Sequence, residues 1–182
     1  MIIAPRGQDR AGFYRRLREL TDTLWRELGD ELNFKLVVSH DAFVTYDGRG
    51  NVGIAPYDQL DEDDLFAQIV FHELCHWRCE GIRSREQPDW GLDNTSQQDV
   101  HAEHAALILQ ARWSSQHALT DVLIPTTDFR PWYESLPADP WRMETAAARH
   151  ADKAWSSLDP AFALIDTALA VTARHARELC VA

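Results

Sequence analysis

Apolar residues near the start of the chain recur at the spacing of a helix. Five of them lie three or four positions apart: Phe13, Leu17, Leu20, Leu24 and Leu28. Residues at this spacing line one face of an α-helix, and that face then packs against a core. We therefore predict an amphipathic helix from about Asp9 to Gly29, with the glycine ending it.

The next apolar stretches have the composition of β-strands. FKLVVS, residues 34–39, is apolar and β-branched and predicts a strand. AFVTYDGRGNVGIAP, residues 42–56, places a glycine-rich turn, DGRGN, between two strand-like pieces. This arrangement predicts a β-hairpin, so we expect a small sheet near the N-terminus.

Two helices are predicted after the hairpin. The first covers about residues 63–80 and stops at Gly81. The acidic sequence DEDD, residues 61–64, lies at its start, where negative charge suits the helix dipole. The second helix covers about residues 98–116 and is apolar enough to be buried.

The rest of the chain is predicted to add helices without another strand. A proline-rich stretch, residues 119–140, predicts an irregular connection. Asp-Pro pairs at 139–140 and 159–160 predict two more helices, because Asp suits the N-cap and Pro suits the first helical position. The chain has no internal repeat and no linker-like boundary. We predict one domain over residues 1–182, of the α+β class with helices in the majority.

Charge and composition argue against several classes of partner. Lys and Arg number 18 against 29 Asp and Glu, a net charge of −11, whereas nucleic-acid binding needs clustered basic residues. No basic run suits an anionic membrane surface, and no uncharged run is long enough to span a bilayer. The first ten residues lack the apolar segment of a signal peptide, and the odd number of cysteines, three, suits a reducing compartment. We predict a cytoplasmic protein without a nucleic-acid or membrane partner; the sequence does not indicate an oligomeric state.

One apolar helix carries a pair of histidines. IVFHELCHWRCEG, residues 69–81, places His72 and His76 four positions apart, so both imidazoles point from the same helix face toward one metal ion. Glu73 lies about 100° round the helix, close enough to act as a base without being a ligand. This is the HExxH pattern of two histidine ligands and a carboxylate base. Two stray histidines on a surface helix are the alternative, and the apolar residues on both sides disfavour it.

A third ligand is expected from the next helix, because a catalytic metal normally has three protein ligands. DVHAEHAALILQ, residues 99–110, offers His101, Glu103 and His104. Glu103 is the first candidate, since it begins an E-x-x-A pattern similar to that of zincins whose third ligand is glutamate. His104 follows because it lies on the inward apolar stripe, and His101, the most peripheral, is third.

A longer pattern in this region resembles a known family. HELCHW, residues 72–77, is followed after eleven residues by Asp89-Trp90-Gly91. The combination resembles the elongation factor P hydroxylase family over about residues 66–110. The resemblance implies a zincin-like fold, in which the HExxH helix packs on a second ligand-bearing helix. It also implies a non-haem iron monooxygenase that hydroxylates a modified lysine side chain of a translation factor.

The resemblance also implies roles for particular residues. It places His72, Glu73 and His76 at the metal, and it has Asp89, Trp90 and Gly91 shape the site. The chain departs from the family's pattern after Gly91, where the loop is shorter and QQDVHAEH replaces an acidic patch.

Two reaction classes remain open at the level of the sequence. We favour an Fe(II)-dependent hydroxylase that acts on a protein or peptide side chain, because the spacing of Asp89-Trp90-Gly91 belongs to the resemblance. The alternative is a zinc metallopeptidase with Glu73 as general base. A binding module with a structural metal ranks third, since such a site does not need a carboxylate beside the first histidine.

Overall fold

The computed structural model describes residues 2, 4–5, 9–93, 98–156 and 160–181. Its helices are α1 (Asp9–Glu31), α2 (Phe66–Glu80), α3 (Val100–Gln116), α4 (Arg130–Glu134), α5 (Ala146–Ser156) and α6 (Ala161–Val181). Short 3₁₀ helices connect them: η1 (Tyr57–Gln59), η2 (Ser84–Glu86), η3 (Pro88–Gly91) and η4 (Pro140–Arg142). The chain is α+β and mostly helical, as predicted.

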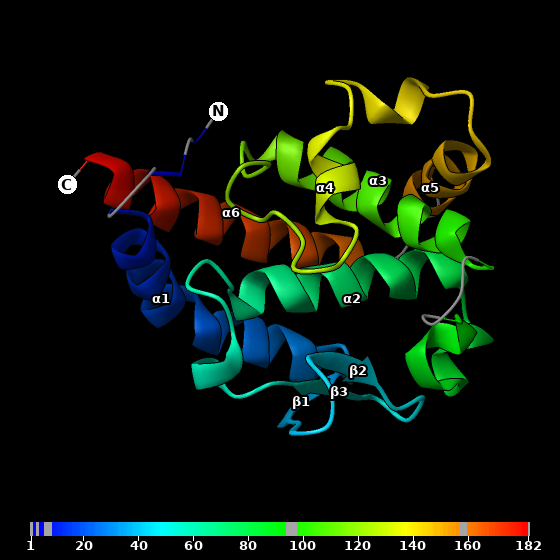
Figure 1. The fold of residues 1–182 in the computed structure, drawn as a ribbon, viewed down its shortest axis with the longest axis horizontal. Coiled ribbons are helices and arrows are strands. Elements are labelled where there is room, and N and C mark those ends of the chain that lie inside the picture. Colours follow the sequence, from blue (N-terminus) through cyan, green and yellow to red (C-terminus); the bar gives the residue numbers. More distant parts are fainter. Residues whose placement is uncertain (1, 3, 6–8, 94–97, 157–159, 182) are drawn as a thin grey trace.

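α2 runs through the middle of the molecule (Figure 1). α1 and the small sheet lie on one side of it, and α3 and α4 lie on the other. α5 packs against α3, and α6 packs against α1. Within the described residues no helix combines the length and the hydrophobicity needed to cross a membrane.

The sheet has three strands in the order β1-β3-β2. β2 (Val44–Tyr46) and β3 (Asn51–Ile54) are antiparallel neighbours, so the predicted hairpin is confirmed. The predicted strand at residues 34–39 is β1 (Lys35–Val38), which pairs with β3 in parallel. Gly50 is required in the hairpin turn, because its φ is +92° and a Cβ there would lie 2.7 Å from the Asn33 carbonyl oxygen.

α1 extends beyond its predicted end. It continues past Gly29 to Glu31. A Cβ at position 29 would lie only 2.7 Å from the carbonyl oxygen of Phe34. Gly29 therefore does not end the helix; it lets the following chain turn back closely against it.

α2 begins at Phe66 instead of Asp63, because residues 61–64 make other interactions. The carboxylate of Asp63 pairs with Arg10 at 2.6 Å and with Arg130 at 2.8 Å. Oδ2 of Asp64 accepts a hydrogen bond from the backbone N–H of Asp61 at 2.8 Å. These contacts hold the acidic segment in a turn that precedes the helix.

The two Asp-Pro pairs do not both open helices. Asp139-Pro140 begins only η4, and α5 starts later, after Thr145. The Thr145 hydroxyl accepts a hydrogen bond from the backbone N–H of Ala148 at 3.1 Å, so Thr145 caps α5 instead. Pro160 directly precedes α6, and Asp159 lies outside the described residues.

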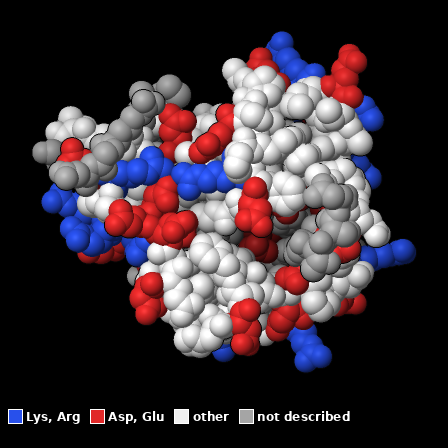
Figure 2. All heavy atoms as spheres, viewed as in Figure 1, with Lys and Arg blue, Asp and Glu red and all other residues white. Residues whose placement is uncertain are grey.

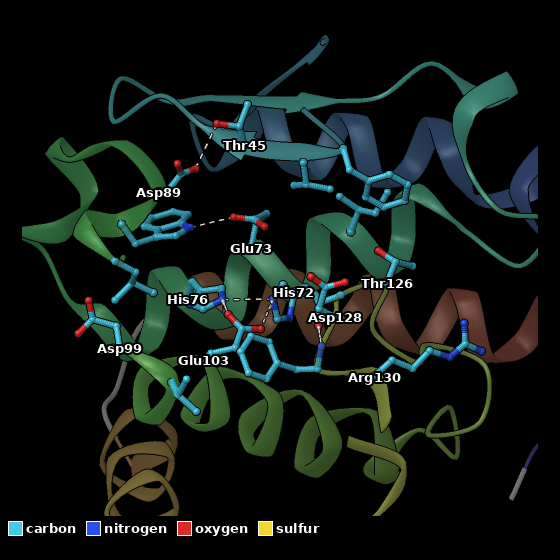
Figure 3. Close-up of a pocket in the computed structure, with 18 of the residues that line it drawn as sticks. Thr45, His72, Glu73, His76, Asp89, Asp99, Glu103, Thr126, Asp128 and Arg130 are labelled. Atoms are coloured by element: carbon cyan, nitrogen blue, oxygen red, sulfur yellow. Dashed lines mark hydrogen bonds and ion pairs between the residues drawn. The ribbon is translucent and has the colours of Figure 1, made fainter. Parts of the chain in front are cut away.

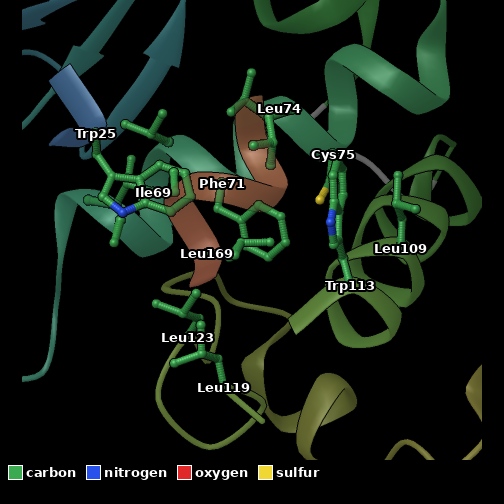
Figure 4. Packing of buried hydrophobic residues seen from close by; sticks show 14 of the residues in the cluster. Trp25, Ile69, Phe71, Leu74, Cys75, Leu109, Trp113, Leu119, Leu123 and Leu169 are labelled. Atoms are coloured by element: carbon green, nitrogen blue, oxygen red, sulfur yellow. The ribbon is translucent and has the colours of Figure 1, made fainter. Parts of the chain in front are cut away.

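The apolar core surrounds α2. Of its fifteen residues, all but Arg78 and Glu80 are buried. Trp25 of α1 and Trp113 of α3 are fully buried and pack on opposite sides of Phe71, with ring centroids 6.1 and 5.7 Å away (Figure 4). A helix buried on every face carries polar side chains only where those side chains have partners.

Candidate metal centre

Three side chains from two helices converge at the wall of a cavity. His72 and His76 project from α2, and Glu103 projects from the first turn of α3 (Figure 3). Oε1 of Glu103 lies 3.2 Å from Nε2 of His72, and Oε2 lies 3.1 Å from Nε2 of His76. One ligand atom from each residue falls within 4.8 Å of the others. These are the residues that the sequence ranked first as ligands.

The contacts within this group suit a bound cation. The two Nε2 atoms of His72 and His76 face each other at 3.2 Å, and two lone pairs at this distance repel unless a proton or metal ion lies between them. Oε1 of Glu103 is buried and has no hydrogen-bond partner, although His72 is within ion-pair distance. The three donors therefore point at a common centre.

Electrostatic pairing outweighs burial at this centre. Burial lowers the pKa of His72, but the carboxylate of Glu103 raises it by more than burial lowers it. The pKa of His72 is therefore raised to about 9. Burial likewise raises the pKa of Glu103, and the imidazoles of His72 and His76 nevertheless hold it well below its usual range. Without a metal, the group thus holds an ionised carboxylate against a protonated imidazole, so it stabilises positive charge.

Gln110 holds His72 from the side away from the centre. Nδ1 of His72 lies 2.9 Å from Oε1 of Gln110, and the amide Nε2 of Gln110 donates to the Leu123 carbonyl at 2.9 Å. Because that donation orients the amide oxygen toward His72, the neutral ring, which is the form that binds a metal, carries its proton on Nδ1 and presents Nε2 to the centre. Gln110 was not among the residues predicted for the site. The sequence feature that could have indicated it is the presence of a polar residue within the apolar run after Glu103.

The structure does not bring the other two histidine candidates into the group. His104 stacks on Trp132, with ring centroids 3.6 Å apart and an interplanar angle of 3°, and meets Phe129 edge-on. His101 is exposed to solvent. The position of His104 on the apolar stripe of α3 made it a candidate ligand, but aromatic residues after α3 cover this side chain instead.

Glu73 lies beside the metal group without joining it. Its Oε2 accepts a hydrogen bond of 2.8 Å from the indole N–H of Trp90 (Figure 3). The Trp90 ring is stacked on Tyr46 of β2, with centroids 3.9 Å apart and planes 6° from parallel. The carboxylate of Glu73 is thus fixed at the cavity wall by a buried aromatic pair.

The segment Asp89-Trp90-Gly91 forms a tight left-handed turn. Its φ angles are 46°, 62° and 75°, values that cost energy for residues other than glycine. The carboxylate Oδ1 of Asp89 offsets this cost, since it accepts hydrogen bonds from the Thr45 hydroxyl at 3.1 Å and the Tyr46 backbone N–H at 3.0 Å. The structure therefore docks this turn against β2 and places Trp90 over Glu73.

The cavity has a volume of about 630 Å³ and an acidic lining. Eight carboxylates line it: Asp61, Asp64, Glu73, Asp89, Asp93, Asp99, Glu103 and Asp128. Arg130 is the only Arg or Lys among its described lining residues, and its guanidinium pairs with Asp63 at 2.8 Å and Glu134 at 3.2 Å. On the face of the molecule drawn in Figure 2, acidic side chains gather over the middle, beside a band of basic ones. The cavity therefore favours positive charge.

Asp64 is the most deeply buried of the carboxylates in this lining. It is 1% exposed. Burial raises its pKa to about 6, and the backbone hydrogen bond from Asp61 opposes that rise. Residues 61–64 were predicted only as the start of a helix, and their place in the cavity was not predicted.

Comparisons with known proteins identify no relative of this chain: no family model, no curated protein and no solved structure matches it. The geometry of the centre and its cavity is therefore the basis for a functional proposal.

Proposed function

We propose that this chain is a metal-dependent enzyme that binds one divalent ion through His72, His76 and Glu103. The observation that carries the proposal is the convergence of these three donors at the wall of a cavity large enough for a side chain or short peptide. Three protein ligands leave coordination positions for water or substrate, as in catalytic metal sites. Two imidazoles and a carboxylate with a buried, unpartnered oxygen fit such an ion.

We propose Fe(II) as the metal and hydroxylation of a protein or peptide side chain as the reaction. Two histidines and one carboxylate are the donor set of non-haem iron oxygenases, in which Fe(II) supplies the redox chemistry that activates dioxygen. The resemblance of HELCHW and Asp89-Trp90-Gly91 to the elongation factor P hydroxylases supports this choice. The packing of α2 on the ligand-bearing α3 supports a zincin-like fold.

The surrounding residues give each reactive group one orientation. Gln110 directs Nε2 of His72 toward the centre, and Trp90 holds Oε2 of Glu73. Because Glu73 faces the cavity, its carboxylate is placed to bind a polar group of the substrate. A hydroxylase needs this function, since the bond that reacts must be held at a fixed position relative to the ligands.

A zinc metallopeptidase is the second candidate, and one observation favours it. Glu73 directly follows His72, lies outside the ligand group and is held in place by Trp90. A carboxylate fixed in this way suits a general base that takes a proton from water. Zn(II) would supply Lewis acidity without redox chemistry.

The charge of the cavity supports a cationic substrate group. Eight carboxylates line it, and the guanidinium of the only Arg or Lys among its described lining residues is already paired with Asp63 and Glu134. An anionic side chain would meet repulsion from several directions, whereas an amine or guanidinium would be attracted. A lysine-like side chain therefore suits this cavity, and it agrees with the substrate implied by the resemblance.

The test compares two metal forms of the same protein. Metal-free protein is loaded with Fe(II) under anaerobic conditions or with Zn(II), then mixed with lysine-containing peptides and an excess of a two-electron reductant such as ascorbate, with and without O₂. The reductant supplies the two electrons that convert the second oxygen atom of O₂ to water. We expect the iron form to give an O₂-dependent mass gain of one oxygen atom and the zinc form to be inactive. Cleaved peptides from the zinc form, with no oxidised product from the iron form, would defeat the hydroxylase and support the peptidase. His72→Ala is the matched control for both reactions.

A further inference from the structure

Two buried glutamine amides hold the segment of chain that leads into the cavity wall. Gln68 of α2 is 1% exposed, and its Nε2 donates a hydrogen bond to the Ile124 carbonyl oxygen. Gln110 of α3 is fully buried, and its Nε2 donates to the carbonyl oxygen of the preceding residue, Leu123, at 2.9 Å. The two helices that carry the metal ligands therefore each fasten one of two consecutive carbonyls.

This segment depends on such support because its own backbone supplies little. Residues 124–126 belong to no helix or strand, and among the described residues they form no backbone–backbone hydrogen bond. Irregular backbone must find other partners for its polar groups, and side-chain amides are suitable ones. The two glutamines thus fix a stretch of chain that no regular element holds.

The same stretch continues into the wall of the cavity. Thr126, Asp128 and Arg130 follow it and line the cavity that also contains His72 (Figure 3). The far end of this wall is held by the guanidinium of Arg130, which pairs with Asp63 at 2.8 Å. The carboxylate of Asp128 lies between the two anchored ends, so its position depends on both.

Gln110 also joins the wall to the metal centre. Its Oε1 lies 2.9 Å from Nδ1 of His72, while its Nε2 holds the Leu123 carbonyl. One planar amide thus links a metal ligand to the start of the wall. Gln68 holds the adjacent carbonyl alone, since its Oε1 is buried without a hydrogen-bond partner.

We propose that Gln68 and Gln110 form an amide clamp that fixes the cavity wall, residues 126–130, relative to His72. This inference rests on the proposed function, because the wall would contact its substrate. Gln68 is then a positioning residue for the substrate, and Gln110 is one for both the substrate and the metal. A wall that is already ordered presents Asp128 to a cationic group without an ordering cost on binding.

The experiment uses Gln68→Met and Gln110→Met, in which a flexible, unbranched side chain fills the space and the amide is lost. Zn(II) affinity is measured by competition with a chelator, and calorimetry measures the binding of a lysine-containing peptide to metal-free protein. We expect Gln110→Met to bind Zn(II) about 10- to 100-fold more weakly than wild type, and Gln68→Met to bind it as wild type does. Both should bind the peptide about 3- to 10-fold more weakly, because the wall must then be ordered on binding. Gln116→Met, at an exposed position at the end of α3, is the matched control.

Backbone dynamics give a readout that needs neither metal nor peptide. ¹⁵N relaxation should give order parameters of about 0.85 for Ile124, Thr126 and Thr127 in wild type, falling toward about 0.6 in both variants. A double variant adds a second check. Asp128→Asn should weaken peptide binding less in Gln68→Met than in wild type, because its carboxylate is no longer held in place there.

The outcomes separate the amide clamp from the proposed function. If wild type binds neither Zn(II) nor Fe(II), the metal centre fails, and the order parameters still decide the clamp. Unchanged order parameters in both variants overturn the clamp whichever metal binds, and unchanged peptide affinity refutes its role for the substrate. An equal loss of Zn(II) affinity in both variants overturns the separate roles of the two glutamines. If Gln68→Met does not fold, Gln68→Asn, whose amide is one methylene shorter, is measured in the same way.

Discussion

The indole N–H of Trp90 donates a 2.8 Å hydrogen bond to Oε2 of Glu73. The two residues are seventeen positions apart and lie on different elements, a left-handed turn and the central helix. The bond joins the turn, which is anchored on β2 by Asp89, to the carboxylate beside the metal group. The orientation of Glu73 thus depends on the hairpin as well as on its own helix.

Trp90→Phe tests whether this bond sets the orientation of Glu73. The variant keeps an aromatic ring to stack on Tyr46 but loses the indole donor. We expect turnover per bound metal to fall by about 10- to 100-fold, because a hydrogen bond to a charged group contributes roughly 1.5–3 kcal/mol. Metal content should stay at the wild-type level. Loss of metal in this variant would show that Trp90 supports the ligands instead.

The ligand set has a direct test in metal content. His72→Ala, His76→Ala and Glu103→Ala each remove one of three protein ligands, so each should lose most of its bound metal after dialysis. His101→Ala and His104→Ala are matched controls on the same helix as Glu103 and should keep theirs. Elemental analysis of the five proteins gives the answer. Full metal in Glu103→Ala together with loss in either control would move the third ligand to a histidine.

Asp89 should stabilise the fold through its contacts to β2. Asp89→Ala removes the acceptor of the Thr45 hydroxyl and the Tyr46 backbone N–H, and alanine also tolerates the left-handed φ less well than Asp. We expect the free energy of unfolding to drop by about 1–3 kcal/mol, measured by urea denaturation. Asp89→Asn keeps an oxygen acceptor and suits the same backbone, so it should lose less. Equal stability of the two variants would contradict this account.

Asp64 should make the stability of the metal-free protein depend on pH. Burial raises its pKa from an ordinary 3.8 to about 6, so the folded state binds this proton more tightly than the unfolded chain. The stabilising contribution of the protonated carboxyl is therefore present below pH 3.8 and is lost as the pH rises through about 6. Asp64→Asn cannot ionise, and its amide oxygen can still accept the Asp61 N–H.

This pH dependence predicts how the free energy of unfolding differs between wild type and Asp64→Asn. At about pH 7.5 the variant should be more stable by on the order of 2 kcal/mol, and at about pH 4 the difference should approach zero. Urea denaturation at both pH values measures it. Glu62→Gln, an exposed neighbour, is the control and should show no such trend. A difference that stays constant with pH would rule out ionisation of Asp64 as its cause.

The acidic cavity should select the charge of the substrate. Asp61→Asn and Asp128→Asn each remove one negative charge from the lining outside the ligand group. We expect each to raise the KM for a lysine peptide by about 3- to 10-fold, with a weaker effect at high salt. The same peptide with acetylated lysine should bind wild type poorly and respond little to either change. Glu19→Gln on the exposed face of α1 is the control, and an equal effect there would refute local charge selection.

The sequence alone predicted the features that depend on neighbours along the chain. The helical spacing of apolar residues located α1, α2 and α3, and the glycine-rich turn located the hairpin. His72 and His76 were placed on one face because a helix brings residues four apart together whatever surrounds it. The apolar residues on both sides of this pair also predicted the burial of α2.

Other features depended on contacts between distant segments, and only the tertiary structure decided them. Glu103 joins the two histidines because α3 packs on α2 with one particular rotation, and the same packing turns His104 toward Trp132. The late start of α2 follows from the ion pairs of Asp63 with residues 53 and 67 positions away. The acidic cavity and the Trp90–Glu73 bond likewise join segments whose approach depends on the whole core, and local periodicity carries no information about such approaches.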